Sequence, residues 1–461
     1  IRDTDRSRGL GDVYKRQPKI LYAVEGSRIS ETSVEIKWVV SEKNPVDGLA
    51  IWEEGTTEER QISLENASAG QYTITGLTPR TTYYVALTNS AAPEGAEKYN
   101  QQRFTTAGMP ADAVVVEDGV DLMGKIKAGM TDASKQALVF QLKNGVDYYL
   151  TEGGEVAAKT GDIKLTKSIA LLANPGERPT LYIREGCFNV KPESGNMPDI
   201  EYFVVDNVNI KETWTESKPS KGSKTRLLNI GKHDAGTDFT IDRFEITNSD
   251  IVLPSAVLMM SDASEGVTTI NHIRIDNCLV SGINTSAVTK QFGFIHAINK
   301  GSNVWNDVSV TNSTFYEFYI SPGVFGAPTA DVPIAAGNKV VISNCTFYNW
   351  GSNKDGKNTY RAVGNFSKLT TPLNLSVSNC VFGSSKSKVL DAGSVNLNSK
   401  GNYCTLDFEK MSDAGLTLIS LDTDDASLFR NVEENDFTVV DAESVIYKSE
   451  YGDPRWIKVL D

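Results

Sequence analysis

The chain has 461 residues, of which 59 are acidic and 46 are basic, giving a formal net charge of -13 at pH 7. Nucleic-acid-binding proteins need a basic surface, so this balance excludes that class of partner. No stretch approaches the roughly 18 consecutive apolar residues of a membrane-spanning helix, so we also exclude a transmembrane span.

Residues 1–17 fit neither of the domains that follow. They contain no apolar core, no small-residue cleavage site and no strand-like alternation. The segment resembles translated adapter sequence, so we expect a non-native leader and leave it out of the fold. A secretion signal or a lipid anchor on a missing natural leader stays open.

Residues 18–107 alternate apolar and polar side chains over several short segments. These segments are Val34–Val40, Ala50–Trp52, Tyr72–Ile74 and Tyr83–Leu87. A period of two with one buried face predicts an antiparallel β-sandwich. Residues 108–113 then form a short linker.

One corner of this module has a recognisable pattern. The run Gly76-Leu-Thr-Pro-Arg-Thr-Thr-Tyr83 resembles the corner of fibronectin type III domains. The resemblance implies that Tyr83 is the corner tyrosine and Trp38 the core tryptophan, both with packing roles. In bacterial glycan-degrading systems such a module usually acts as a spacer.

An asparagine recurs behind an apolar or β-branched segment through the centre of the chain. The six positions, separated by 41, 29, 35, 32 and 35 residues, are Asn207, Asn248, Asn277, Asn312, Asn344 and Asn379. Repetition at this period predicts a solenoid with loops of varying length. Asparagine tolerates left-handed backbone and bonds locally in turns. We therefore predict that the six side chains stack one over another inside the solenoid.

The residues around these asparagines resemble the right-handed parallel β-helix of the pectate-lyase superfamily. Apolar residues flank each asparagine, as in Val310-Thr-Asn-Ser-Thr-Phe315 and Ile342-Ser-Asn-Cys-Thr-Phe347. The resemblance covers residues 114–461 and implies an N-terminal cap and a C-terminal closing segment. The closing segment, residues 427–456, resembles that of surface-glycan-locus β-helix proteins of gut bacteria. The expected fold is therefore all-β, a sandwich followed by a β-helix.

Three of the five cysteines directly follow an asparagine of the repeat. Cys278, Cys345 and Cys380 occupy this position, where Ser249 and Ser313 stand in other copies. The shared position indicates an inward corner that accepts a small side chain. We interpret these cysteines as buried thiols rather than disulfides.

By the same resemblance, the first strand of each rung lines the groove. The candidate segments are Arg226–Ile230, Ala256–Met260, Phe292–Ile298, Val332–Gly337, Tyr360–Phe366 and Lys388–Gly393. β-Elimination from a uronate needs a base for the C5 proton and a cation for the carboxylate. Arg361 or Lys388 is the candidate base, and Tyr360 or His296 the candidate acid. Asp391 is the candidate ligand for Ca²⁺, the one cofactor left open.

Sugar contacts are expected from loop side chains. Lys290 lies just before the candidate segment Phe292–Ile298. Trp305, Tyr319 and Trp350 lie in or beside loops, where a ring can stack on a sugar face. Each ring could equally pack a loop against the helix.

The sequence contains few groups of acidic residues that could catalyse hydrolysis of a glycosidic bond. Glycoside hydrolysis needs two carboxylates about 5–9.5 Å apart, and the polygalacturonase and classical pectate-lyase signatures are absent. The adjacent pair Asp424 and Asp425 falls in the C-terminal tail. We interpret Asp422-Thr-Asp-Asp425 as a solvated turn rather than a Ca²⁺ loop.

Two functions remain open. The first is an extracellular or cell-surface protein that binds polysaccharide in the groove and cleaves it, by pectate-lyase-like β-elimination or, as the less favoured alternative, by hydrolysis. The second is a non-catalytic surface protein that captures polysaccharide or oligosaccharide for partner enzymes. Both place the protein outside the cell or on the outer-membrane surface, and we expect a monomer.

Overall fold

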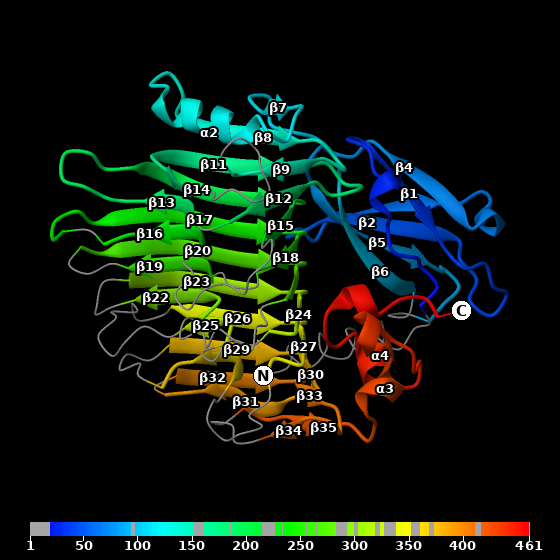
Figure 1. Cartoon of the computed structure of the whole chain (residues 1–461). Coiled ribbons are helices and arrows are strands. Elements are labelled where there is room, and N and C mark those ends of the chain that lie inside the picture. The colour runs from blue at the N-terminus through cyan, green and yellow to red at the C-terminus, as the bar shows by residue number, and fades with distance from the viewer. Residues whose placement is uncertain are drawn as a thin grey trace, which may run out of the picture. The chain divides into compact units, whose positions relative to one another are not determined.

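The computed structural model describes most of the chain and divides it into two compact units (Figure 1). The described residues are 19–93, 97–151, 161–184, 186–213, 226–232, 234–253, 257–262, 266–282, 293–298, 303–318, 323–326, 338–351, 360–367, 373–393, 395–410 and 416–460. The first unit comprises the chain up to Ala111, Asn174–Glu177 and the segment from Ala426 onward. The second unit comprises Asp112–Ala173 and Arg178–Asp425.

The first unit contains an antiparallel β-sandwich. One sheet pairs β1 (Ser33–Lys37) with β4 (Gln71–Thr75). The other has the order β3-β2-β5-β6, formed by β3 (Glu59–Ser63), β2 (Gly48–Glu53), β5 (Thr82–Thr88) and β6 (Lys98–Thr105). Side chains of both sheets, such as Ile36 and Val85, share one apolar core. The predicted antiparallel sandwich is confirmed.

Tyr83 and Trp38 both pack inside this sandwich. The Tyr83 hydroxyl accepts a hydrogen bond from the backbone N–H of Thr78 at 3.1 Å, and its ring packs on Phe104 with 5.9 Å between centroids. A tyrosine that bonds back to the chain a few residues upstream is the geometry of a tyrosine corner. Trp38 is 4% exposed.

The closing segment of the chain packs within the first unit. Its elements are α3 (Asp425–Leu428), β36 (Phe429–Asn431), η4 (Val432–Glu434), β37 (Asp436–Val439), α4 (Val445–Ser449) and η5 (Pro454–Trp456). Strands β36 and β37 pair antiparallel, and Glu450, which follows α4, forms an ion pair with the buried Lys19. The sequence predicts that this segment closes the β-helix, whereas in the structure residues from Ala426 onward belong to the compact unit of the sandwich.

The second unit is a right-handed parallel β-helix built from three long sheets, in which every strand pairs in parallel with its equivalent in the next rung (Figure 1). The first sheet contains β10 (Gly161–Lys164), β13 (Gly186–Val190), β16 (Arg226–Ile230), β19 (Val257–Asp262), β22 (Ile295–Ile298), β25 (Phe325–Gly326), β28 (Arg361–Asn365), β31 (Lys386–Asp391) and β34 (Glu409–Lys410). The second sheet contains β7 (Val114–Val116), β8 (Ala137–Leu142), β11 (Lys167–Leu172), β14 (Asp199–Asp206), β17 (Phe239–Thr247), β20 (Thr268–Asp276), β23 (Asn303–Thr311), β26 (Lys339–Ser343), β29 (Leu373–Ser378) and β32 (Val395–Lys400). The third sheet contains β9 (Asp147–Tyr149), β12 (Thr180–Ile183), β15 (Asn209–Glu212), β18 (Asp250–Val252), β21 (Leu279–Ser281), β24 (Thr314–Tyr316), β27 (Thr346–Tyr348), β30 (Val381–Gly383), β33 (Tyr403–Cys404) and β35 (Ile419–Ser420).

A short helix packs at the N-terminal end of the β-helix, where the resemblance implied a cap. Helix α2 (Leu122–Thr131) buries Leu122, Ile126 and Met130 in the solenoid core. An end rung exposes unpaired backbone groups, so a covering helix protects that edge. The described part of the chain contains no helix with the length and apolar character needed to cross a bilayer.

Aromatic side chains stack along the inside of the third sheet. Phe315, Phe347 and Phe382 occupy equivalent positions on successive rungs, each with 5.1 Å to the next ring centroid and planes within 10° of parallel. All three are fully buried. The parallel register therefore turns one phenylalanine per rung into a continuous apolar column.

The six repeated asparagines form the tight turn between the second and third sheets. Each has a left-handed backbone, with φ between 51° and 59°. The Asn277 amide donates to Asn248 Oδ1 at 2.8 Å, and that of Asn344 to Asn312 Oδ1 at 3.5 Å. The side chains are half-buried, so the stack lies at a corner of the solenoid rather than inside it as predicted.

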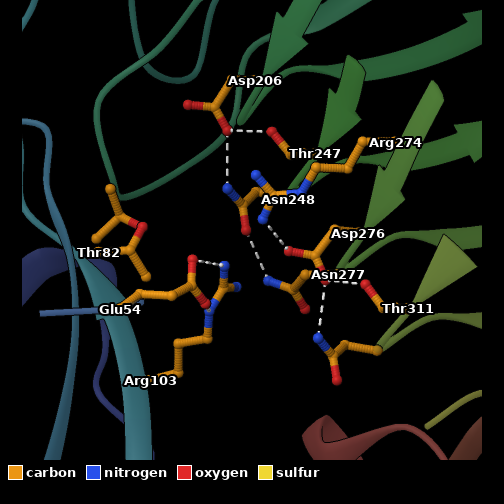
Figure 2. Close-up of polar contacts among 12 residues, drawn as sticks. Glu54, Thr82, Arg103, Asp206, Thr247, Asn248, Arg274, Asp276, Asn277 and Thr311 are labelled. Atoms are coloured by element: carbon orange, nitrogen blue, oxygen red, sulfur yellow. Dashed lines mark hydrogen bonds and ion pairs between the residues drawn. The ribbon is translucent and has the colours of Figure 1, made fainter. Parts of the chain in front are cut away.

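Aspartates interrupt the asparagine ladder (Figure 2). Asp206 Oδ1 accepts from Thr247 Oγ1 and Asn248 Nδ2, each at 2.7 Å. Asp276 Oδ1 accepts from Thr311 Oγ1 at 2.7 Å and from the Asn312 amide at 2.8 Å. Each carboxylate therefore satisfies two donors of the next rung.

Replacing Asn312 by leucine should lower the free energy of unfolding by about 1–3 kcal/mol, because the left-handed turn and the amide contacts are both lost. Chemical denaturation monitored by circular dichroism measures the change. Asn312→Gly keeps the turn conformation and should recover part of the loss. The exposed Asp424 provides a control, since Asp424→Ala should be nearly silent. Equal free energies of unfolding for Asn312→Leu and Asp424→Ala would contradict the role of the stacked amides.

The cysteines of the repeat are buried free thiols. The Cys278 thiol lies 3.4 Å from the carbonyl oxygen of Asp276, two residues before it, and Cys345 and Cys380 make the same contact with Ser343 and Ser378 at 3.3 Å each. In Ser249 and Ser313 the hydroxyl donates to the equivalent carbonyl. The predicted interpretation as thiols at an inward corner is confirmed.

Candidate functional site

The longest connections of the β-helix flank its first sheet. Residues 213–225 link β15 to β16, and residues 282–294 link β21 to β22, whereas only Asn248 and Ser249 link β17 to β18. Loops carried by a rigid scaffold are the usual place for binding sites. The outward face of the first sheet is therefore the candidate site, on the sheet that the resemblance implied.

One outward row of side chains follows the register of this sheet from rung to rung. Its members are Asn189, Asn229, Met260, His296, Gly326, Asn365 and Asp391. The preceding residues in the strands, such as Leu228, Met259 and Ile295, are fully buried in the core. Because side chains alternate along a strand, the row points away from the core, with about 4.7–4.9 Å between neighbouring strands. Within the row, Met260 and Gly326 are nevertheless buried.

In the rung of β25 the strand differs from the sequence prediction. The candidate segment was Val332–Gly337, which lies outside the described residues, whereas the strand of this rung is Phe325–Gly326. The predicted segments in the neighbouring rungs overlap β22 and β28.

Three of the predicted site residues meet at the C-terminal end of the row. Asp391 Oδ1 accepts from Lys388 Nζ at 2.8 Å, and Asp391 Oδ2 accepts from the Arg361 guanidinium. The three side chains are 16%, 27% and 14% exposed. Burial alone would raise the pKa of the Asp391 carboxyl, but the hydrogen bonds and charges of Lys388 and Arg361 outweigh it and hold that pKa below its usual value.

This ion-pair cluster changes the roles predicted for its members. Lysine and arginine that donate to a carboxylate lack the free lone pair of a base, so the geometry argues against proton abstraction by Arg361 or Lys388. A Ca²⁺ ion at Asp391 would have to displace both cations. Among the described residues, no group of three His, Cys, Asp or Glu side chains is arranged to hold a metal ion.

His296 is a mostly buried, neutral side chain in the middle of the row. Burial first, and then the charge of Arg226, lower the pKa of its imidazole to about 4. Its Nδ1 accepts a hydrogen bond from the backbone N–H of Gly293 at 3.2 Å, which leaves the proton on Nε2. A ring with this pKa is a poor proton donor to a leaving group at neutral pH, so the predicted acid role is not supported.

Glycine at position 326 makes room for the His296 ring. A Cβ built on Gly326 would lie 1.7 Å from His296 Nδ1, so no larger residue fits beneath the ring. Tyr360, the other candidate acid, packs its ring on Gly351, where an added Cβ would lie 2.5 Å from Tyr360 Cγ, and against the solenoid core.

The structure contradicts the predicted sugar contact of Trp350 and leaves that of Trp305 untested. Trp350 is fully buried, lies 5.2 Å from the Phe408 ring centroid, and donates from Nε1 to the Lys388 carbonyl at 3.1 Å. Trp305 lies on β23 of the second sheet, in register with the fully buried Ile270, and packs against the core. Trp350 is therefore a core residue, whereas Trp305 is partly buried at the edge of the core. Lys290 and Tyr319 lie outside the described residues.

Polar residues at the other end of the row were not singled out from the sequence. Asn229 Nδ2 donates to Asn189 Oδ1 at 2.8 Å, and the Arg226 guanidinium donates to Asn229 Oδ1. The available signal was an asparagine between two apolar residues of a first strand, as in Phe188-Asn-Val190 and Leu228-Asn-Ile230. Whether two such asparagines meet depends on the register of their strands, which the sequence pattern alone does not show.

The interpretation of residues 422–425 as a solvated turn is wrong for one residue. Asp422 and Asp424 are exposed, but Asp425 is 2% exposed. Its Oδ2 accepts from the backbone N–H of Ser384 at 2.9 Å, and its own N–H donates to Asp407 Oδ2 at 3.1 Å. Burial, reinforced by the nearby Asp407 carboxyl, raises the pKa of Asp425 to about 7 despite the opposing influence of the nearby Thr405 hydroxyl and the hydrogen bond from the Ser384 N–H.

The architecture defines the second unit as a parallel β-helix with a polar row along its first sheet. A family model described as a domain of unknown function, DUF5123, matches residues 340–456, the last rungs and the closing segment. No curated protein matches the sequence.

Two solved structures are similar to the chain at low identity. The catalytic domain of a GH87 alpha-1,3-glucanase variant in complex with nigerose shares 9% identity, over 86% of this chain and 92% of that chain, with a TM-score of 0.24. The family 28 exopolygalacturonase of Yersinia enterocolitica shares 11%, over 88% and 98%, with a TM-score of 0.18. Similarity at this level carries no inference about activity, and the fold class follows from the three parallel sheets themselves.

Proposed function

We propose that the β-helix is an extracellular or cell-surface module that binds an acidic polysaccharide along the outward row of its first sheet. The observation that carries the proposal is the in-register series of polar groups, from Asn189 and Asn229 through His296 to Asn365 and Asp391, which the buried Met260 and Gly326 interrupt. Asparagine offers both donors and an acceptor, which suits the hydroxyl groups of successive sugars. A linear polymer can follow such a row across several rungs.

The charges of the row favour an acidic polymer over a neutral one. Arg226 lies at one end, and Arg361 and Lys388 lie at the other, with Asp391 as their shared partner. The chain as a whole carries a net charge of -13, whereas the cluster of Arg361, Lys388 and Asp391 carries one net positive charge. Local positive charge overcomes long-range repulsion and concentrates an anionic ligand.

Capture without cleavage is the form of the function that the geometry supports best. Arg361 and Lys388 are placed to neutralise a uronate carboxylate, which is one requirement of β-elimination. Both donate to Asp391, and His296 is neutral with its Nδ1 occupied, so no described side chain of the row is poised as the base. Hydrolysis lacks a partner carboxylate, because the row holds Asp391 as its one described acid.

Binding should be measurable by affinity electrophoresis and calorimetry against polygalacturonate and alginate, with dextran as a neutral comparison. We expect Lys388→Gln to weaken binding of the acidic polymer by about tenfold or more, because one charge-assisted contact is worth roughly 1.5–3 kcal/mol. The matched control is Lys339→Gln on the second sheet, whose side chain is 59% exposed and lies 3.7 Å from Asp307. That variant should bind like the parent protein.

Three results would count against this function. Equal affinity of the Lys388→Gln and parent proteins would show that the row is not part of the binding site. Stronger binding to dextran would show that the ligand is not an acidic polymer. Release of unsaturated sugar ends, followed by their ultraviolet absorbance, would show cleavage and replace capture by a lyase activity.

A further inference from the structure

Among the described residues, no hydrogen bond of normal geometry reaches two oxygen atoms that are buried in the last rungs of the β-helix. They are Asp425 Oδ1 and Thr405 Oγ1, in residues that are 2% and 1% exposed. A buried polar atom without a partner costs about 1–3 kcal/mol, and more when it carries charge. A ligand that binds these two atoms would offset this cost.

A glycine creates the space into which Asp425 points. Gly383 ends β30 and pairs in register with Tyr348, so a side chain of this column is missing at its rung. A Cβ on Gly383 would lie 2.5 Å from Asp425 Oδ1. The Ser384 N–H holds the other carboxylate oxygen at 2.9 Å, so the orientation of the carboxylate is set by the backbone.

A second carboxylate, that of Asp407, lies beside this space. Asp407 belongs to an exposed turn, and its Oδ2 accepts the Asp425 N–H at 3.1 Å. Among the described residues, the side chains that act most strongly on the Asp425 carboxyl are Thr405 and Asp407, and neither carries positive charge. Two neighbouring carboxylates, one of them buried, are costly unless a cation lies between them.

We propose that Asp425, Asp407 and Thr405 bind a Ca²⁺ ion at the C-terminal end of the β-helix. Ca²⁺ prefers carboxylate, hydroxyl and carbonyl oxygens and accepts waters for the remainder of its 6–8 ligands. The buried oxygens form the base of the site, and the exposed Asp407 leaves a route for the ion and its waters. The ion would fasten Asp425, the last residue of the second unit, to the preceding rungs at Gly383 and Thr405.

This proposal does not depend on the binding of polysaccharide. Only two carboxylates contribute, so we expect a dissociation constant of about 10⁻⁴–10⁻³ M, as in extracellular calcium modules. Calorimetric titration of the full chain with CaCl₂, after treatment with EDTA, should show one site, and the melting temperature should rise with Ca²⁺ concentration. Asp425→Asn and Thr405→Val should each weaken binding at least tenfold.

Two controls separate this site from other effects of Ca²⁺. Asp424→Ala changes the exposed neighbour and should keep the full response, and Asp391→Asn tests the calcium ligand predicted from the sequence and should also keep it. The proposal is overturned if Ca²⁺ at 10 times the expected constant does not shift the melting temperature of the parent protein. An equal shift in Asp425→Asn would overturn it as well. If Asp425→Asn is as stable as the parent in EDTA and neither responds to Ca²⁺, a shared proton between the carboxyl groups replaces the cation.

Discussion

Replacing Phe347 by alanine is expected to lower the free energy of unfolding by about 3–5 kcal/mol, the usual range for truncating a fully buried phenylalanine. Phe347 is 0% exposed and lies 5.1 Å from the ring centroids of both Phe315 and Phe382. Its ring also meets the edge of Trp350 at 6.5 Å. Alanine would leave a cavity in the middle of a stack that continues on both sides, and a close-packed core relaxes only partly into such a gap.

Urea denaturation followed by circular dichroism would measure this loss. The control is Leu406→Ala, because Leu406 is 58% exposed and its truncation should change the free energy of unfolding by less than about 0.5 kcal/mol. Each rung of a solenoid is stabilised mainly by its neighbours, so Phe347→Ala should also broaden the transition. A loss below about 1 kcal/mol would mean that the phenylalanine column is not a continuous part of the core.

The second large effect is an acid-induced loss of stability that depends on His296. Its pKa in the folded protein is lowered to about 4 by burial and by Arg226, whereas an unfolded histidine titrates near 6.5. The unfolded chain therefore binds a proton that the folded protein does not accept between these values. Stability contributed by the neutral ring is complete above pH ~6.5 and is lost as the pH falls toward about 4, by about 3 kcal/mol in total.

The measurement compares the pH dependence of unfolding in the parent protein and in His296→Gln, which stays neutral throughout. Carboxylates also titrate in acid, so the informative quantity is the difference between the two slopes from pH 6.5 to 4.5. His272→Gln provides a matched control, since the His272 side chain is 51% exposed and lies 3.6 Å from Asp307. Parallel slopes for the parent protein and His296→Gln would show that the imidazole is solvated in the folded state.

In the candidate site, the sequence identified residues that meet but not the contacts that they make. Arg361, Lys388 and Asp391 were all singled out, and they do meet, but as an ion-paired cluster rather than as a base and a calcium ligand. Trp350 was interpreted as an aromatic residue in or beside a loop, where its ring could stack on a sugar. In the structure its ring fills the core at the start of that loop. Chain position near a loop does not reveal which way a side chain points.

The buried carboxylate of Asp425 was missed for a related reason. In the sequence it belongs to an acidic run, Asp422-Thr-Asp-Asp425, whose composition is typical of a solvated turn. Its burial depends on Gly383 and Thr405, which are 42 and 20 positions away in the chain. No local pattern connects these three residues.

The amino-acid sequence by itself determined the solenoid, its period and its left-handed asparagine turns, because these depend on local preferences: an asparagine accepts positive φ, and apolar residues beside it enter the core. Only the tertiary structure decided the polar row, the Arg361–Asp391–Lys388 cluster and the Asp407–Asp425 pair. The physical reason is that parallel pairing sets residues of different rungs side by side. The variable loop lengths between those rungs hide that register from any fixed spacing in the chain.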